Sequence, residues 1–222
     1  MNSEKKIVLL GQGSQMIQLM RELFSLEITP DNIKVITVDG EFNNPFTEYL
    51  KYFQIDYYVT NKDNFNTELQ GLIFSFNPDL VISLSNPLIL SKETLSLQTK
   101  FINFHPGILP YYKGSLSTVH SILNNEDFVG GTWHYIDPGI DTGNIIHIVK
   151  IRSEKISAFS LNHKIFSLGI SNLEKVLEKV YSNDPGISQE KKGRFYYNKF
   201  PDVSDLEIET QKRVLYFPPK FT

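Results

Sequence analysis

Cysteine is missing from the 222 residues of this chain, and so is any long hydrophobic run. Without cysteine there is no disulfide, no thiol nucleophile and no thiolate metal site. No stretch approaches the roughly 18 consecutive apolar residues of a membrane helix, and the run Ile7–Leu10 is too short for a signal peptide. The net charge of −3 offers no broad basic surface to a nucleic acid. We therefore expect a cytoplasmic protein that binds neither membranes nor nucleic acids.

Two common kinds of catalytic site are also missing from the sequence. No two histidines have the spacing that places metal ligands on one helix face, and there is no H-E-x-x-H; the scattered ones are His120, His134, His147 and His163. There is no G-x-S-x-G that would present a serine nucleophile. We accordingly expect neither a metal site nor covalent catalysis by the protein.

The chain does contain enough apolar material for a core, with 41% hydrophobic and 13% aromatic residues. Apolar strand-like runs alternate with segments of helical spacing through the first half of the sequence. The expected strands are 6–10, 33–38, 56–60, 79–84 and 101–104, with helices at about 16–24, 45–53 and 69–76. This alternation predicts an α/β fold, a doubly wound, Rossmann-like, mostly parallel sheet whose ligands bind at the carboxyl ends of the strands.

The second half of the chain has a different pattern. Two strand-like runs, Val129–Ile136 and Asn144–Ile151, are joined directly by "DPGIDTG", which predicts antiparallel edge strands. One long helix is expected from Ser157 to Tyr181. We therefore divide the chain into a catalytic domain, residues 1–182, and a C-terminal extension, residues 183–222, with a hairpin and a helical segment.

A glycine-rich turn, "GQGSQM", follows the first expected strand. It lies where a dinucleotide fingerprint would lie, and Asp39 could bind a ribose, but Met16 replaces the small residue that lets helix and strand pack closely. A site for an anion, built on the backbone N–H groups of Gly11, Gly13 and Ser14 at a helix start, is more consistent with these residues. A tight turn without a ligand remains the alternative.

The segment "FINFHPG" carries two polar side chains on one face of a strand. Because side chains alternate along a strand, Asn103 and His105 face the same way while Ile102 and Phe104 are buried. The strand ends at Pro106, so both polar groups emerge at a carboxyl end, where ligands bind in this architecture. Either residue alone fits a structural role, but the pair at this place favours a functional one.

Two later loops supply partners for this pair. The loop after His105 contains Lys113 and Gly114, and "DPGIDTG" contains two carboxylates, Asp137 and Asp141. Either carboxylate could orient His105 and raise its pKa, because an anion stabilises an imidazolium. Both aspartates are also ordinary turn formers, and spacing alone does not choose between them.

An amide, an imidazole and a carboxylate without a nucleophile suit a reaction whose nucleophile is the substrate itself. The amide and an imidazolium donate hydrogen bonds to an oxyanion, and the carboxylate accepts the proton that an attacking amine loses. Two alternatives stay open at this point. One is a non-catalytic nucleotide-binding module, and the other is a dinucleotide oxidoreductase.

The segment from Ile102 to Ile146 resembles the folate-dependent formyltransferases. The residues that carry the resemblance are "NFHPGILP", "YKG" and "GIDTGNII", together with "GQGSQ" near the N-terminus. The family includes glycinamide ribonucleotide transformylase, methionyl-tRNA formyltransferase and the sugar N-formyltransferases. The resemblance implies that Asn103, His105 and Asp141 are the catalytic residues, and it makes Asp137 a loop residue.

The resemblance also implies a co-substrate, 10-formyltetrahydrofolate, whose formyl group passes to a primary amine without a metal. Its pterin is expected between "LSNPLIL" and "DPGIDTG", mostly on backbone groups. The expected folate-binding residues are Ser85, Asn86, Pro87, Leu88, Ile89, Asp137, Gly139, Ile140 and Asp141.

The segment "GRFYYNKFPD" in the tail is similar to small sugar N-formyltransferases that act on nucleotide-linked amino sugars. We therefore expect a dTDP-linked amino-dideoxysugar, such as dTDP-4-amino-4,6-dideoxyglucose, as the amine substrate, in lipopolysaccharide O-antigen biosynthesis. The expected substrate-binding residues are Gly11, Gln12, Gly13, Ser14, Lys113, Tyr196 and Tyr197. The alternative is phosphoribosylglycinamide formyltransferase of purine biosynthesis. The tail could instead pack a dimer, and a homodimer is expected.

Overall fold

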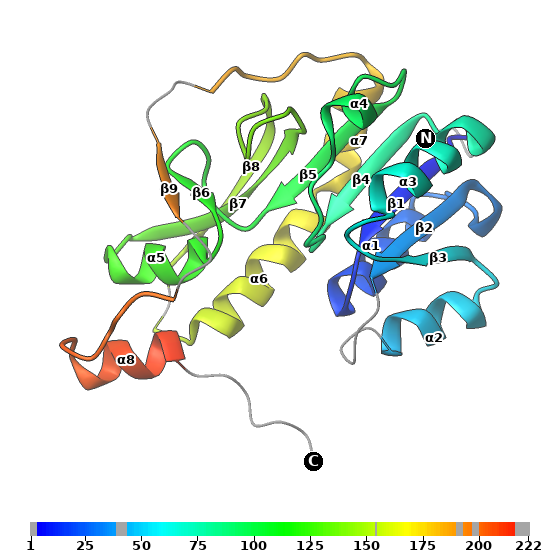
Figure 1. Cartoon of the computed structure of the whole chain (residues 1–222). Coiled ribbons are helices and arrows are strands. Elements are labelled where there is room, and N and C mark those ends of the chain that lie inside the picture. Colours follow the sequence, from blue (N-terminus) through cyan, green and yellow to red (C-terminus); the bar gives the residue numbers. More distant parts are fainter. Residues whose placement is uncertain (1–3, 39–43, 154, 190–192, 197–199, 216–222) are drawn as a thin grey trace.

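The structure, a computed structural model, describes residues 4–38, 44–153, 155–189, 193–196 and 200–215 (Figure 1). Its centre is a seven-stranded sheet of order β3-β2-β1-β4-β5-β7-β8. The strands are β1 (Ile7–Gly11), β2 (Ile33–Val38), β3 (Asp56–Thr60), β4 (Leu80–Leu84), β5 (Lys100–His105), β7 (Phe128–Tyr135) and β8 (Ile145–Arg152). The first five are parallel, and β7 and β8 are antiparallel, as the sequence predicts.

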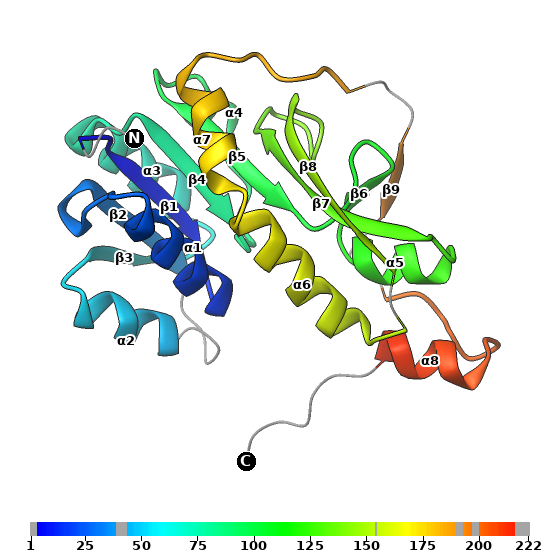
Figure 2. The same cartoon turned by 180° about the vertical axis from the view of Figure 1, so that it is seen from behind.

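Helices cover both faces of the sheet (Figure 2). One face packs against α1 (Ser14–Ser25), α2 (Asn44–Tyr52), α5 (Ser117–Leu123), α6 (Ala158–Ile170) and α7 (Leu173–Tyr181). The other face packs against α3 (Phe65–Phe76) and the segment around α4 (Lys92–Leu95). Neighbouring residues of β1 face opposite layers, since Leu9 packs in the first core and Leu10 in the second. This double burial explains why the parallel strands read as continuous apolar runs.

The register of the central strands sets the place of the site. Ser83 of β4 pairs with Asn103 of β5, and Asn103 pairs on its other side with His134 of β7. Gly11, the last residue of β1, pairs with Leu84. The glycine turn and Asn103 therefore lie two strands apart at the same end of the sheet, about 10 Å at ordinary strand spacing.

The helix expected from Ser157 to Tyr181 is two helices, and that prediction is wrong at its middle. The helix α6 ends at Ile170 and α7 begins at Leu173. Between them, the side chains of Ser171 and Asn172 each donate to the carbonyl oxygen of Leu168, both at 2.9 Å. Short polar side chains that bind the backbone in this way compete with helical hydrogen bonds.

The extension does not form the expected hairpin in the part that the structure describes. Its strand β9 (Arg194–Tyr196) pairs in parallel with β6 (Tyr112–Gly114), a strand that the sequence pattern did not predict. The Glu-rich segment does form a helix, α8 (Ile208–Leu215), which packs against α5 and α6. Asp39, the residue considered for a ribose, lies outside the described residues. Among the described helices, none is both long and apolar enough to cross a membrane.

Candidate active site

His105 ends β5 and is buried, with 5% of its surface exposed. Its Nε2 lies 2.6 Å from the carbonyl oxygen of Tyr112 and 3.0 Å from Oγ of Ser117. A carbonyl only accepts hydrogen bonds, so Nε2 carries a proton and donates it to Tyr112. In the neutral imidazole, the basic nitrogen is therefore Nδ1.

The turn after His105 is shaped around the imidazole. A Cβ at Gly107 would lie 2.5 Å from Nε2 of His105 and 2.7 Å from the carbonyl oxygen of Tyr112, so only glycine fits there. The hydroxyl of Thr132, fully buried on β7, donates to the Gly107 carbonyl at 2.7 Å and accepts from Leu109 N–H at 3.1 Å. These contacts hold the loop that follows His105 in one conformation.

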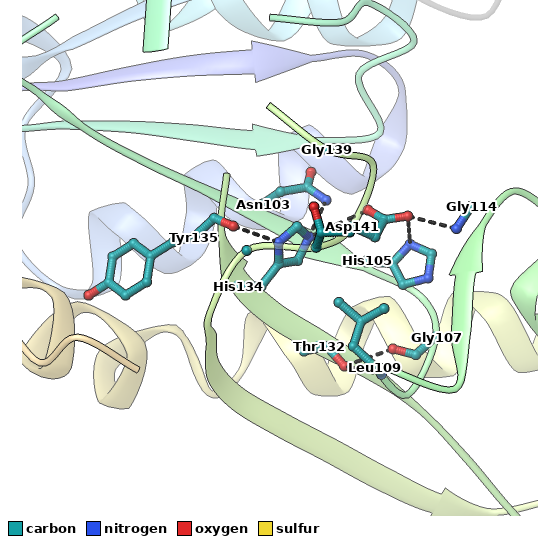
Figure 3. A network of polar contacts seen from close by, with 12 residues as sticks. Asn103, His105, Gly107, Leu109, Gly114, Thr132, His134, Tyr135, Gly139 and Asp141 are labelled. Atoms are coloured by element: carbon teal, nitrogen blue, oxygen red, sulfur yellow. Dashed lines mark hydrogen bonds and ion pairs between the residues drawn. The ribbon is translucent and has the colours of Figure 1, made fainter. Parts of the chain in front are cut away.

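Asp141 is the carboxylate that reaches this histidine, from the loop between β7 and β8 (Figure 3). Its Oδ2 lies 3.4 Å from Nδ1 of His105 and accepts a hydrogen bond from Gly114 N–H at 2.8 Å. Its φ of 53° is left-handed, a conformation that Asp and Asn tolerate better than most residues. Asp137 instead accepts hydrogen bonds from Gly139 N–H at 3.1 Å and Thr142 Oγ1 at 2.6 Å, so its side chain organises the turn.

His134, which in the sequence is one of several scattered histidines, joins the same cluster. It is buried on β7, and its Nε2 lies 3.2 Å from Nδ2 of Asn103 and 3.5 Å from Oδ1 of Asp141. Its Nδ1 lies 2.8 Å from the carbonyl oxygen of Tyr135, so Nδ1 carries the proton and Nε2 accepts from the amide. Figure 3 shows His134 between the side chains of Asn103 and Asp141. A signal for this role is present in the sequence: Thr132 and His134 are two residues apart on one strand, as Asn103 and His105 are, and the two pairs lie opposite each other on β7 and β5.

Burial and neighbouring charges set the pKa values of His105 and Asp141. Burial lowers the pKa of His105 below its ordinary 6.5 and outweighs the opposite effects of Asp141 and the Tyr112 carbonyl. Asp141 thus raises the pKa of His105, as expected of a neighbouring anion, but burial has the larger effect and the net pKa lies below 6.5. Burial also raises the pKa of Asp141, but His134, His105 and the Gly114 N–H together bring it below 3.8. At neutral pH the pair is an ionised carboxylate beside a neutral imidazole.

The glycine turn lies at the carboxyl end of β1, as expected. A Cβ at Gly11 would lie 1.9 Å from the carbonyl oxygen of Leu84, so this glycine is required for the close approach of β1 and β4. Gly13, with a φ of 80°, precedes α1, and Ser14 is the exposed first residue of that helix. Gln12 is half-buried. This arrangement leaves a helix N-terminus facing the end of the sheet where His105 lies.

The segment expected to hold the pterin follows β4. Ser85 has a left-handed φ of 53°, and the side chain of Asn86 closes a turn by accepting from Leu88 N–H at 3.1 Å and donating to the Leu88 carbonyl at 3.0 Å. Leu88 packs in the same core layer as Ile136, so the segments before and after the site share one face of the sheet. Ile89 and Ile140 are exposed, at 73% and 48%.

Of the three remaining residues expected to bind the substrate, the structure describes Lys113 and Tyr196 but not Tyr197. Lys113 is buried, with 8% of its surface exposed, next to Gly114 on β6. Tyr196 pairs with Gly114 through β9, which brings its backbone to the strand that contacts Asp141. Tyr197 lies outside the described residues. In the described part of the chain, no group of three or more His, Cys, Asp or Glu side chains has an arrangement that could hold a metal ion.

Comparison with known proteins identifies the family of the chain. A family profile described as formyl transferase matches residues 5–165. GDP-perosamine N-formyltransferase of Brucella melitensis biotype 1 is 32% identical over 154 residues, which are 65% of this chain and 60% of that protein. The chain thus spans less than two thirds of the length of this curated relative.

Solved structures share the fold at lower identity. The N-formyltransferase from Helicobacter canadensis, in complex with folinic acid and dTDP-3-aminofucose, has a TM-score of 0.73 at 24% identity, over 94% of this chain and 80% of that one. A 4-N formyltransferase from Francisella tularensis has a TM-score of 0.75 at 19% identity, over 98% of this chain and 90% of that one. At these identities the likeness concerns the fold.

Proposed function

Because the chain belongs to the formyl transferase family, we propose that it is an N-formyltransferase that moves formyl from 10-formyltetrahydrofolate to the amine of a nucleotide-linked amino sugar. The observation that carries this proposal is the buried cluster of Asn103, His105 and Asp141 at the carboxyl end of β5. These three side chains supply hydrogen-bond donors and a proton acceptor. The nearby Ser117 hydroxyl is not activated as a nucleophile, because His105 Nε2 already carries a proton, so the attacking group is the substrate amine.

The chemical steps follow from the protonation states. The neutral amine attacks the formyl carbon, and the carbonyl electrons move to the oxygen to give an oxyanion. Asn103 donates to that oxyanion through the second N–H of the amide whose first N–H binds His134. The amine proton passes to Asp141 or through it to Nδ1 of His105, which lies 3.4 Å away. The oxyanion then collapses, the bond between the formyl carbon and the folate nitrogen breaks, and that nitrogen takes up the proton from His105 or Asp141.

His105 acts in this scheme as a base that becomes a cation during the reaction. Its Nε2 is already bound to the Tyr112 carbonyl, so Nδ1 is the ring atom that faces the proton path. The 3.4 Å separation from Asp141 is longer than the 2.7–2.9 Å of a direct charge-assisted hydrogen bond. That spacing leaves Nδ1–H room to interact with a substrate oxygen as well. The positive charge on His105 therefore develops together with the negative charge of the oxyanion. The attraction between the two charges offsets the cost of burying the imidazolium.

The amine substrate that we propose is a dTDP-linked amino-dideoxysugar such as dTDP-4-amino-4,6-dideoxyglucose. Two of the proteins named above support this substrate class: one is a GDP-perosamine N-formyltransferase, and the other was solved with dTDP-3-aminofucose. The sugar diphosphate is placed at the glycine turn, Gly11–Ser14, about 10 Å from the reacting amine at Asn103. The folate lies between the segment after β4 and the β7–β8 loop. Residues 1–182 then form the catalytic domain and residues 183–222 the extension that completes the site of a homodimeric, cytoplasmic enzyme of O-antigen biosynthesis.

Direct assay of formyl transfer tests the proposed function. The protein is incubated with 10-formyltetrahydrofolate and, separately, with dTDP-4-amino-4,6-dideoxyglucose, its 3-amino counterpart, GDP-perosamine and glycinamide ribonucleotide. We expect N-formylated dTDP-sugar by mass spectrometry and no product from glycinamide ribonucleotide. Turnover of glycinamide ribonucleotide alone would show that the amine substrate is a purine precursor. Product from GDP-perosamine alone would show that the sugar substrate carries GDP and not dTDP.

His134 is expected to support the reaction by orienting Asn103 and Asp141. We predict that His134→Leu lowers kcat about 10- to 100-fold with little change in KM, because the amide loses the acceptor that fixes its orientation. His134→Gln keeps a hydrogen-bonding group near that place and is expected to recover part of the rate. Steady-state kinetics of both variants checks this. Equal rates for the two variants would contradict an orienting hydrogen bond.

A further inference from the structure

Residues 184–189, which we name the strap, lie along the loop that carries Asp141. Ile187 and Ile145 exchange two backbone hydrogen bonds of 2.8 Å. The Asn144 side chain donates to the Pro185 carbonyl at 2.9 Å. A Cβ at Gly186, whose φ is 71°, would come within 2.7 Å of the Ile145 carbonyl, so strap and loop approach closely. Figure 1 shows the strap in orange, on the way from α7 to β9.

The last residue of the strap binds the backbone of Asp141 itself. The Nε2 of Gln189 donates to the Asp141 carbonyl at 3.0 Å and to the Gly143 carbonyl at 2.7 Å. Its Oε1 is buried and has no hydrogen-bond partner within the described part of the chain. A buried acceptor without a partner is unfavourable. The position of the Gln189 side chain is therefore set by its amide N–H groups, which bind the carbonyls on either side of Thr142.

The chain beyond the strap pairs with the strand that binds the Asp141 side chain. Beyond the strap, β9 pairs with β6, with Tyr196 opposite Gly114. Gly114 N–H donates to Oδ2 of Asp141 at 2.8 Å, and this oxygen is the one that faces His105. The extension therefore contacts the Asp141 loop through Gln189 and supports the strand whose N–H orients the carboxylate.

We propose that Gln189 is a positioning residue for Asp141, and this inference rests on the proposed function because it takes Asp141 as a participant in formyl transfer. Gln189 lies beyond residue 165, where the match to the family profile ends. It holds the backbone of a residue with a left-handed φ of 53°. A misplacement of a reacting group by about 1 Å can lower a rate by about 100-fold. Loss of the two N–H donors is therefore expected to lower kcat and to leave substrate binding, measured as KM, nearly unchanged.

The test compares Gln189→Met, which keeps the length of the side chain without its donors, with Gln189→Glu, which places a carboxylate against two carbonyl oxygens. The matched control is Gln211→Met, because Gln211 also donates through Nε2 to two carbonyls, those of Ser204 at 3.2 Å and Leu206 at 2.8 Å. We expect kcat to fall about 10- to 100-fold in Gln189→Met and further in Gln189→Glu, with KM nearly unchanged. The Gln211 variant stays within about twofold of the wild type, because within the described residues the half-buried Gln211 binds only carbonyls of its own segment, far in sequence from the Asp141 loop.

A double-mutant cycle separates positioning from general stability. In an Asp141→Asn background, Gln189→Met is expected to add no further loss of kcat, since the group that it positions is already disabled. The same fold-loss in both backgrounds would overturn the proposal, and so would a Gln189→Met enzyme as fast as the Gln211 control.

Hydrogen exchange gives a readout that does not need activity. We expect the amides of residues 141–145 to exchange faster in Gln189→Met and to be unchanged in Gln211→Met. Unchanged exchange in Gln189→Met overturns the positioning contact. If the wild-type protein formylates no amine, the proposed function fails, and exchange alone then decides whether Gln189 holds the loop.

Discussion

His105→Ala is expected to lower kcat for formyl transfer roughly 1000-fold while the protein remains folded. The variant removes the nitrogen that faces Asp141 and therefore both the proton acceptor and the cation that develops beside the oxyanion. It also removes the donor to the Tyr112 carbonyl at 2.6 Å, but Ser117 Oγ still contacts that carbonyl at 3.4 Å. Product formation under saturating folate and amino sugar, with thermal unfolding of the same sample, measures the effect.

His147→Ala is the matched control for this variant. His147 lies on β8 and, like His105, has a pKa lowered below 6.5 mainly by burial. It has no contact with Asp141 among the interactions that the described residues make, so its removal is expected to leave kcat within about twofold. A folded His105→Ala enzyme that retains wild-type turnover would show that His105 takes no part in the reaction.

The pH dependence of stability provides a second measurement on His105→Ala. The folded pKa of His105 is below 6.5, and its unfolded pKa is near 6.5. Between these two values the unfolded chain binds more protons than the folded protein, so stability decreases as the pH falls through that window. The alanine variant lacks this contribution. Its free energy of unfolding is expected to depend less on pH just below 6.5 than that of the wild type.

The positions of Asn103 and His105 can be predicted from the alternation of side chains along a strand. Asn103 and His105 are two residues apart on a strand that ends in Pro-Gly, and the structure places both at the expected end of the sheet. The resemblance selected Asp141 over Asp137, and the geometry agrees, because only Asp141 approaches His105 within the described chain. The local rules succeed here because each residue is positioned by its own strand or turn.

The remaining features depend on contacts that sequence period does not encode. His134 faces Asn103 only because β7 pairs with β5 in one particular register, and that register is a tertiary property. Gln189 contacts Asp141 from 48 positions further along the chain. The sign of the pKa change at His105 depends on the balance between burial and a carboxylate 3.4 Å away, and both quantities exist only in the folded protein.

Asp141→Asn is expected to lower kcat roughly 100- to 1000-fold, because it removes the carboxylate that receives the amine proton. Asn is the least disruptive replacement at this position, since it tolerates the left-handed φ of 53° and its Oδ1 can accept from Gly114 N–H as the aspartate does. The loss is therefore one of charge and basicity rather than of shape. Asp137→Asn is the matched control, and it is expected to affect turnover much less because Asp137 binds only groups of its own turn in the described structure.

The imidazole titration of His105 in the two proteins tests the electrostatic reason for this loss. Asp141 raises the pKa of His105 against the effect of burial, so Asp141→Asn is expected to move the His105 pKa further below 6.5 in an NMR titration. The folded pKa of Asp141 lies below 3.8, so its stabilising contribution is complete above that pH and is lost as the pH falls through the folded value. The stability difference between wild type and Asp141→Asn should then shrink in strong acid. A His105 pKa that rises in Asp141→Asn would show that the carboxylate does not stabilise the imidazolium, and the proton path through this pair would be wrong.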